Sequence, residues 1–254
     1  METTIVCPSG LSGRIRPLTA RAASVLTDAK AIRSGRAADS ILKACWVETL
    51  DLGPYPFERD VDWSKVLICD RTYALMGVRI ATYGDTYEIN QTCANCENRF
   101  FWDVPLSEIP KKELSDLAKT QISSGTNEFE STMMDGRKIV WKLLTGKDLA
   151  QSLPKIRDNR DDLIVQVVKC RVKSIEGLDT SRIEEYLSGL GMGEIQNLSL
   201  QMDEVDGGLE TEIEIRCPSC HLEWPIELPL DLVAMFSLRR KTNMARRHAG
   251  PFRE

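Results

Sequence analysis

Residues 93–106 read Cys-Ala-Asn-Cys-Glu-Asn-Arg-Phe-Phe-Trp-Asp-Val-Pro-Leu, and residues 217–230 read Cys-Pro-Ser-Cys-His-Leu-Glu-Trp-Pro-Ile-Glu-Leu-Pro-Leu. Each segment contains a Cys-x-x-Cys pair, then three residues and an aromatic residue (Phe100 or Trp224), then three residues and an aliphatic-Pro-Leu ending. Two such pairs supply four thiolates, which is the ligand set of a tetrahedral structural zinc site. The sequence therefore predicts one metal site that connects two parts of the chain about 120 residues apart.

The predicted zinc ligands are Cys93, Cys96, Cys217 and Cys220. Because the protein fills all four coordination positions, the zinc is expected to be structural, with no open position for a substrate. The alternatives are two redox-active pairs, four buried free thiols or an iron–sulfur cluster. Redox pairs of the thioredoxin type lie between a strand and a helix, whereas both pairs here are expected between strands. The cysteine spacing does not favour a cluster.

Other residues near the two Cys-x-x-Cys pairs are weaker candidates for contact with the metal. His221 follows Cys220 directly and could replace a cysteine ligand, but beside a complete pair it is expected near the metal or in solvent. A tetrathiolate zinc centre carries a net charge of about −2, which Arg99 or Arg216 would offset. The remaining cysteines share no spacing with these pairs and are Cys7, Cys45, Cys69 and Cys170. Of these, Cys45 and Cys69 are predicted to be small core residues, because they lie on apolar helical stretches.

Composition narrows the class of protein. The chain has 254 residues and a formal net charge of −5 at pH 7, which allows one large domain or two small ones. A negative charge argues against a dedicated nucleic-acid binder, whose binding domain is usually basic. No membrane span and no secretory signal is predicted. Eight cysteines without an export signal indicate a reducing compartment, where thiolates bind metal rather than each other.

No enzyme site is predicted. With only two histidines, a histidine-rich catalytic or metal centre is excluded, and no nucleophile stands beside a base. The segment from Ser9 to Gly13 could suggest a phosphate-binding loop, but no Gly-Lys-Ser/Thr follows it. The favoured interpretations of this segment are a structural loop or a surface that docks on a partner.

The apolar pattern predicts an α+β protein in three parts. Residues 1–84 are expected to form an N-terminal helical region, of which residues 1–18 are irregular because prolines and glycines interrupt them. Residues 85–238 are expected to form a split zinc-ribbon-like region of short antiparallel hairpins with inserted helices. Residues 239–254 form a basic tail, either an electrostatic arm or a solvated flexible end, with the flexible end favoured.

Individual elements follow from capping residues such as Thr19, from Gly84 as a helix stop, from the hairpin turn Asp135-Gly136 and from periodicity. Helices are predicted over residues 19–33, 38–46, 61–81, 110–117, 146–157, 180–190, 193–204 and 231–238. Strands are predicted over residues 86–92, 99–104, 128–134, 137–144, 210–216 and 222–228. Residues 163–172 fit a helix or a buried strand, and a helix is favoured. Each Cys-x-x-Cys pair therefore lies at the tip of a hairpin.

Several short motifs carry a family resemblance: Pro8-Ser9-Gly10-Leu11-Ser12-Gly13-x-Ile15-Arg16-x-Leu18, Gly53-Pro54-Tyr55, Asp62-Trp63, Asp70-Arg71, Arg79-Ile80-Ala81-Thr82-Tyr83-Gly84-x-x-Tyr87, and the first Cys-x-x-Cys pair with Phe100 and Trp102. Together they resemble the T-even-phage-type baseplate proteins, also described as baseplate hub assembly chaperones, of contractile-tailed phages and prophages. The resemblance covers most of the chain. The family offers no active site to carry over, so the resemblance implies assembly or structure rather than catalysis.

The leading hypothesis is therefore a zinc-stabilised, non-enzymatic protein that helps to build the hub of a contractile tail. It would act either as a scaffold that leaves or as a part that stays. The partners implied are other phage tail or baseplate hub proteins, in the host cytoplasm during assembly and in the virion baseplate if the protein stays. The alternative is a zinc-ribbon regulator that binds nucleic acid through its basic tail, and a hydrolase ranks last. The sequence indicates neither the partner nor the oligomeric state.

Overall fold

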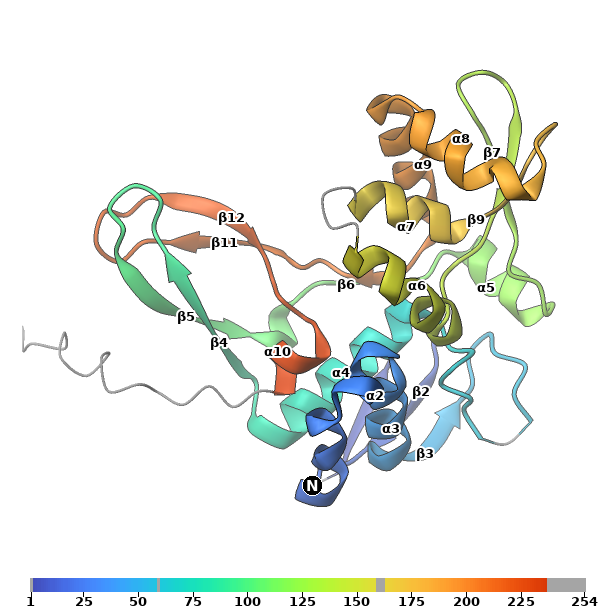
Figure 1. Cartoon of the computed structure of the whole chain (residues 1–254). Coiled ribbons are helices and arrows are strands. Elements are labelled where there is room, and N and C mark those ends of the chain that lie inside the picture. The colour runs from blue at the N-terminus through green and yellow to red at the C-terminus, as the bar shows by residue number, and fades with distance from the viewer. Residues whose placement is uncertain (1, 59, 159–162, 237–254) are drawn as a thin grey trace, which may run out of the picture.

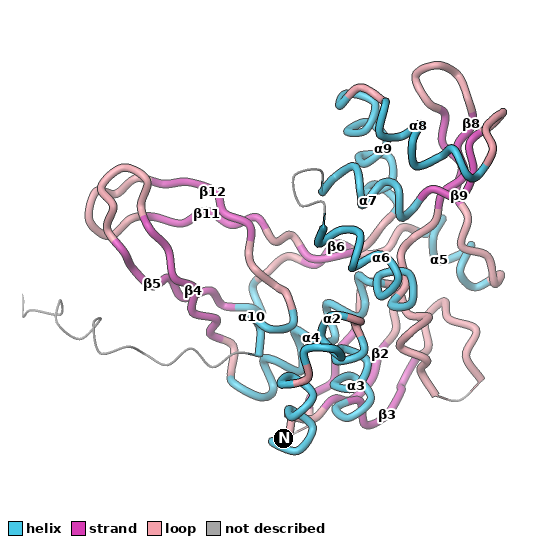
Figure 2. Tube along the Cα trace, viewed as in Figure 1, coloured by secondary structure: helices cyan, strands magenta, loops and turns pink. Residues whose placement is uncertain are grey.

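The computed structural model describes residues 2–58, 60–158 and 163–236, and its helices and antiparallel sheets confirm the α+β class (Figure 1). Three groups of elements are visible in Figures 1 and 2. The N-terminal elements form one part of the body, and the helices of the middle of the chain cover a second small sheet. An arm made of two hairpins extends away from both. The basic residues 239–254 lie outside the described residues.

The N-terminal part contains a sheet that the sequence did not predict. Strands β1 (Thr3–Val6), β2 (Ser12–Ile15) and β3 (Trp46–Asp51) pair antiparallel in the order β1-β2-β3. The prediction that residues 1–18 are irregular is therefore wrong, and the region up to residue 84 is not helical alone. Strands β1 and β2 are each only four residues long. The second neighbour of β2 is β3, which follows some 30 residues later in the chain.

Glycine at position 13 is required by this close pairing. A side chain there would place its Cβ 2.2 Å from Cζ2 of Trp46 and 2.5 Å from the Glu48 carbonyl oxygen. Only glycine lets the backbone of β2 approach β3 so closely.

The predicted helix over residues 19–33 is divided into three short pieces. Thr19 caps α1 (Ala20–Ala23) as expected, since its side chain accepts a hydrogen bond from the Ala22 N–H. A 3₁₀ helix η1 (Ser24–Thr27) follows, and Asp28 then caps α2 (Ala29–Arg33). Helix α3 (Arg36–Cys45) completes the group and buries Ile41, Leu42 and Cys45, so Cys45 is a core residue as predicted.

Helix α4 (Ile68–Tyr83) lies at the centre of the molecule. It contacts α3, β1 and β2 on one side and α10 (Leu232–Phe236) and β10 (Gly208–Leu209) on another. The helix begins later than predicted and ends at Gly84, as predicted, where φ is +88°. The arm starts directly after this stop, so α4 is the base from which the first hairpin leaves.

The middle of the chain forms a three-stranded sheet covered by helices. Its elements are η2 (Leu106–Glu108), β6 (Lys111–Lys112), α5 (Asp116–Ser123), β7 (Phe129–Thr132), β8 (Lys138–Trp141), α6 (Gly146–Asp158), α7 (Leu163–Arg171), β9 (Val172–Ile175), η4 (Thr180–Arg182), α8 (Ile183–Gly189) and α9 (Met192–Val205). The strand order is β7-β8-β9. The hairpin at Asp135-Gly136 and the helix preference over residues 163–172 are confirmed.

The predicted helix over residues 110–117 is wrong. Lys111 and Lys112 instead form β6, which pairs with β10. Helix α5 begins only at Asp116, because the Ser115 side chain accepts a hydrogen bond from the Ala118 N–H and caps it there.

The arm consists of two separate two-stranded hairpins. Strands β4 (Thr86–Thr92) and β5 (Arg99–Pro105) form one, and β11 (Glu212–Arg216) and β12 (Glu223–Glu227) form the other. Their apolar faces meet and bury Ile89, Val104 and Ile215. The predicted strands on either side of both Cys-x-x-Cys pairs are confirmed. Across the described residues, no helix is long and apolar enough to cross a membrane.

Candidate metal centre

The duplicated sequence forms a duplicated turn. In the first turn, the Cys93 N–H donates to the Asn98 carbonyl over 2.9 Å, and the Glu97 N–H donates to the Cys93 carbonyl over 2.9 Å. In the second, the Cys217 N–H donates to the Leu222 carbonyl over 2.8 Å, and the His221 N–H donates to the Cys217 carbonyl over 3.0 Å. These bonds lie at equivalent positions, so each turn presents its two sulfurs in the same way.

One residue in each turn has a left-handed backbone. Glu97 has φ of +57° and His221 has φ of +60°, and each directly follows the second cysteine of its pair. This conformation closes the turn so tightly that both cysteines can face the same point. It is unfavourable for residues with a side chain.

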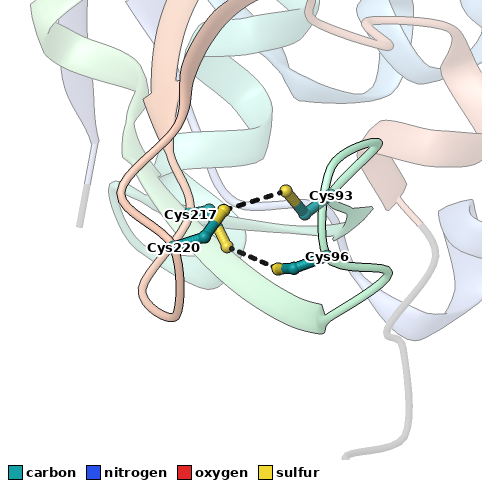
Figure 3. A group of neighbouring side chains, drawn as sticks. All are labelled: Cys93, Cys96, Cys217 and Cys220. Atoms are coloured by element: carbon teal, nitrogen blue, oxygen red, sulfur yellow. Dashed lines mark hydrogen bonds between the residues drawn. The ribbon is translucent and has the colours of Figure 1, made fainter.

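The tertiary structure brings all four predicted ligands together at the tip of the arm (Figure 3). Their sulfur atoms lie within 4.8 Å of one another. The Cys93 and Cys220 sulfurs are 3.5 Å apart, and the Cys96 and Cys217 sulfurs are 3.6 Å apart. The first cysteine of each pair thus lies opposite the second cysteine of the other pair, as a twofold relation between the turns requires.

These distances fit a single tetrahedral ion. With zinc–sulfur bonds of about 2.3 Å, the edge of a tetrahedron of sulfurs is about 3.8 Å. The cluster contains the four cysteines and no other potential ligand among the described residues. His221 is exposed and stands outside it.

Two of the four cysteines, Cys217 and Cys220, have a lowered pKa. The backbone N–H of Leu222 and then the Asn95 side chain lower the pKa of Cys220 to about 6. Burial raises the pKa of Cys217, but the backbone N–H groups of Cys220 and Ser219 outweigh it, so that this pKa is lowered. Backbone amides directed at the sulfurs are what a thiolate ligand needs.

The Cys96 sulfur has the opposite tendency. The Asn98 N–H lowers its pKa, but loss of water and the three neighbouring sulfurs raise it to about 11. Four ionised sulfurs repel one another at this separation. A divalent cation between them would remove that conflict and bind all four as thiolates.

Apolar packing holds the two turns against each other. The rings of Phe100 and Trp224, which occupy equivalent positions in the duplicated segments, meet edge to face at 6.0 Å and 86°. Cys93, Cys217 and Ile215 are buried beneath them, whereas Cys96 is exposed. The cluster is therefore shielded on its inner side and open to solvent beside Cys96.

Arg99 and Arg216 were expected to offset the charge of the cysteine site. Among the described residues, neither of them forms a hydrogen bond or an ion pair with a cysteine sulfur. Arg216 forms an ion pair across its own hairpin with Glu223, with Nε and Oε1 3.6 Å apart, and Arg99 is an exposed residue at the start of β5. The backbone amides, rather than arginine side chains, surround the cysteine sulfurs.

Arg79 fixes the first hairpin to α4. Its guanidinium donates to the carbonyl of Gly84 over 2.9 Å and to that of Thr86 over 3.2 Å. It also lies over the rings of Tyr83 and Tyr87, at 4.9 and 5.8 Å from their centroids. The Tyr87 hydroxyl in turn donates to the Pro229 carbonyl over 2.9 Å, which connects the base of the second hairpin.

A second polar cluster, at Asp70, was not predicted from the sequence. Asp70 is 0% exposed, and its carboxylate accepts bonds from the Ser9 N–H (3.0 Å), the Ser9 hydroxyl (2.5 Å) and the Tyr55 hydroxyl (2.6 Å). Burial raises the pKa of Asp70, although the bonds from Ser9 and Tyr55 oppose that rise. The available signal was that Ser9, Tyr55 and Asp70 all belong to the short motifs that carry the family resemblance.

The Asp70 cluster decides between the two interpretations of residues 8–13. Cys7, Pro8 and Ser9 are buried, and the Ser9 hydroxyl also accepts a bond from the Leu11 N–H over 3.1 Å. Residues 8–11 form a largely buried structural loop that folds onto α4, and residues 12–13 begin β2, so the interpretation of the segment as an exposed docking surface is wrong.

The model of one protein family, described as T4 bacteriophage base plate protein, matches residues 1–236. No curated protein and no solved structure gives a significant match.

Proposed function

The chain belongs to the family of T4 bacteriophage base plate proteins, and on this premise we propose that it is a non-enzymatic structural or assembly protein of the baseplate hub, with a structural zinc ion. The observation that supports this proposal most is the four-cysteine cluster, formed by two duplicated turns within the matched residues. The zinc would bind Cys93, Cys96, Cys217 and Cys220 and hold the two hairpins as one rigid arm.

A zinc ion fits the four cysteines better than an iron–sulfur cluster or two redox-active pairs. In an iron–sulfur cluster the cysteines are divided among two or more iron atoms, so sulfurs on different irons stand further apart than sulfurs around one ion. Here all four sulfurs lie within 4.8 Å of one another. A redox pair would use the two cysteines of one turn, whereas the short contacts of 3.5 and 3.6 Å join different turns. Four thiolates and no open position favour zinc in a structural role.

The arm is the part of the molecule most suited to a partner. It extends from the body as two hairpins whose inner faces are occupied by each other (Figure 1). Two short hairpins have little core of their own, so a metal at the tip would supply rigidity that packing cannot. Exposed Phe101 and Leu222 lie on this arm and are available for contact with hub proteins.

A non-enzymatic role agrees with the other polar cluster. The Asp70 carboxylate is fully buried, and its donors come from residues that are themselves buried. Such a group has no access to a substrate. It positions the Ser9 and Tyr55 segments on α4 instead.

The alternative nucleic-acid role is opposed by the charge on the arm. The outward faces carry the cross-strand acid pairs Glu88–Asp103 and Glu212–Glu227. Carboxylates at these positions would repel a phosphate backbone. We therefore keep the protein–protein role as the proposal.

The metal is tested by elemental analysis and thermal unfolding of three proteins: the wild type, Cys217→Ser and the matched control Cys170→Ser. Cys170 is a half-buried cysteine on α7 outside the cluster. We expect one zinc per chain in the wild type and the control, and a loss of zinc with a lower melting temperature in Cys217→Ser. Metal-free wild type, or iron in place of zinc, would show the assignment to be wrong.

The assembly role is tested in the phage that encodes the chain. Deleting the gene should stop tail assembly at the baseplate, as seen by electron microscopy, and wild-type protein supplied in trans should restore it. Mass spectrometry of finished particles then separates a part that stays from a scaffold that leaves. Normal tails in the deletion phage would end the proposal.

A further inference from the structure

A groove of about 600 Å³ lies between α5, α9 and strand β7. Leu117 and Gln121 of α5 form one wall, and Gln201 and Glu204 of α9 form the other. Glu130 and Ser131 of β7 line it between them. Val140 and Trp141 of β8, the cross-strand partners of Glu130 and Phe129, also line it, so the groove touches residues from both faces of the β7–β8 ladder.

Strand β7 is an edge strand. It pairs with β8, and no strand pairs with its other side in the part of the chain that the structure describes. The Met133 N–H donates to the Arg137 carbonyl over 2.9 Å, which places residue 133 in a hydrogen-bonded pair with the β8 side. Hydrogen-bonded pairs alternate along an antiparallel ladder, so Phe129 and Ser131 also point their backbone groups at β8. The backbone groups of Glu130 and Thr132 therefore point towards the free edge.

The groove is acidic. Its charged lining residues are Glu128, Glu130 and Glu204, and it contains no lysine or arginine. Glu128 forms an ion pair with Lys173. Among the described residues, Glu130 and Glu204 have no ion-pair partner.

The two helices that flank the groove each carry an exposed leucine. Leu117 is 56% exposed, and Leu200, one turn before Glu204 on α9, is 66% exposed. Leu117 lines the groove itself, and Leu200 lies on the helix that forms the opposite wall, so apolar side chains are present on both flanking helices.

We propose that this groove binds an extended, cationic segment of another baseplate protein, which pairs with β7 as an added strand. The unpaired edge calls for a partner that supplies backbone donors and acceptors in an extended conformation. Glu130 and Glu204 favour lysine or arginine side chains in that segment, and the two leucines favour apolar ones. The nature of the partner rests on the proposed baseplate function.

The contact is tested by photo-cross-linking during tail assembly in the phage that encodes the chain. Leu117 is replaced by a photo-reactive benzoylphenylalanine, and the cross-linked peptide is sequenced by mass spectrometry. We expect a basic segment of one tail protein. Hydrogen exchange of the purified complex should then show new protection at the Glu130 and Thr132 amides, while the Phe129 and Ser131 amides, already bonded to β8, change little.

Two substitutions separate backbone pairing from charge. Thr132→Pro removes an outward N–H but spares the ladder to β8, because proline is tolerated on the free side of an edge strand. Its control is Thr132→Ala. Glu130→Lys reverses the groove's charge, and its control is Glu130→Gln. We expect Thr132→Pro and Glu130→Lys each to weaken binding to the cross-linked protein at least tenfold, with zinc content and melting temperature close to the wild type.

The experiments distinguish a failure of the groove proposal from a failure of the proposed baseplate function. If Thr132→Pro and Glu130→Lys both bind the tail protein like the wild type, the strand-addition site is refuted and the baseplate role stands. A cross-link to a second copy of this chain, or to its own residues 239–254, also refutes it, because the occupant would then be the chain itself. If the wild-type chain contacts no tail protein at all, the proposed function fails together with the groove.

Discussion

Two single residues in the turns of the cysteine cluster have a backbone conformation that is unfavourable for residues with a side chain. Glu97 and His221 stand at equivalent positions and have φ of +57° and +60°. The left-handed region costs a residue with a Cβ about 1–2 kcal/mol relative to its preferred regions. The turns retain this conformation because the Glu97 and His221 N–H groups must reach the carbonyls of Cys93 and Cys217.

Glycine at either position should therefore stabilise the protein. We expect Glu97→Gly and His221→Gly each to raise the free energy of unfolding by about 0.5–1 kcal/mol, the relief of strain minus the greater chain entropy of glycine. The measurement is urea unfolding of each protein with zinc added to the buffer. Asn98→Gly is the control, since residue 98 lacks the positive φ, and it should not stabilise. A loss of zinc in His221→Gly would instead mean that the histidine contributes to the metal site.

Asp70 is the residue on which the N-terminal segments converge, and its ionisation should make stability depend on pH. We expect Asp70→Asn to cost about 1–3 kcal/mol, because an amide cannot accept from Ser9 and Tyr55 on both sides. The native pKa of Asp70 is raised. When the pH rises above the ordinary aspartate pKa of about 3.9, Asp70 ionises in the unfolded chain before it ionises in the native protein. The contribution of Asp70 to the free energy of unfolding therefore falls as the pH rises, until the pH passes the raised native pKa.

The difference in unfolding free energy between wild type and Asp70→Asn should therefore be larger near pH 4 than near pH 7. Urea unfolding of both proteins across this range measures it, and effects common to both, including zinc loss in acid, cancel. A difference that grew with pH would mean that Asp70 is held as a carboxylate with a lowered pKa.

At the scale of elements, the two hairpins of the arm share an unfavourable feature. Glu88 lies opposite Asp103, and Glu212 lies opposite Glu227. Both acid pairs occupy the same position relative to their cysteines, five residues before the first and seven after the second. Like charges directly across a ladder are destabilising.

Removing one such repulsion should strengthen its hairpin. We expect Glu212→Lys to increase stability by about 0.2–1 kcal/mol, because an opposite-charge pair replaces a like-charge pair. Thermal unfolding at low and high salt measures it, and the gain should shrink in salt. Glu210→Lys, just before the strand, is the control for net charge alone. An equal gain in both variants would mean that overall charge, not the cross-strand pair, is responsible.

At the scale of the whole molecule, the arm depends on contacts at its two ends. Its tip contains the cysteine cluster, and its base is held by Arg79 on α4 and by the bond from Tyr87 to the Pro229 carbonyl. The body has its own large core around α3, α4 and α9. Loss of the metal should therefore loosen the arm before the body.

Chelation should show this difference. We expect a zinc chelator to speed hydrogen exchange in β4, β5, β11 and β12 by on the order of tenfold for each 1.4 kcal/mol of hairpin stability lost. Amides of α3 and α9 should keep their rates. The measurement is hydrogen exchange with mass spectrometry before and after chelation, with zinc added back as the reversal. Uniform acceleration over the whole chain would mean that the metal stabilises the body as well.

The sequence by itself determined the features that depend on local bonds. The cysteine turns, the strands beside them, the Thr19 cap and the Gly84 stop each need only neighbouring residues, so their spacing predicted them. The α+β class followed from the same local patterns. The repeat of one turn at two sites also predicted which four cysteines meet.

Only the tertiary structure decided the features that depend on residues far apart in the chain. Strands β1 and β2 are too short to be recognised alone, and β2 holds its place in the sheet by pairing with β1 on one side and with the distant β3 on the other. Asp70 gains its partners from segments 61 and 15 residues away, and the open edge of β7 follows from strand order. The free energy of a buried carboxylate or of an unpaired strand edge depends on the groups that surround it. Those surroundings are set by the fold of the whole chain.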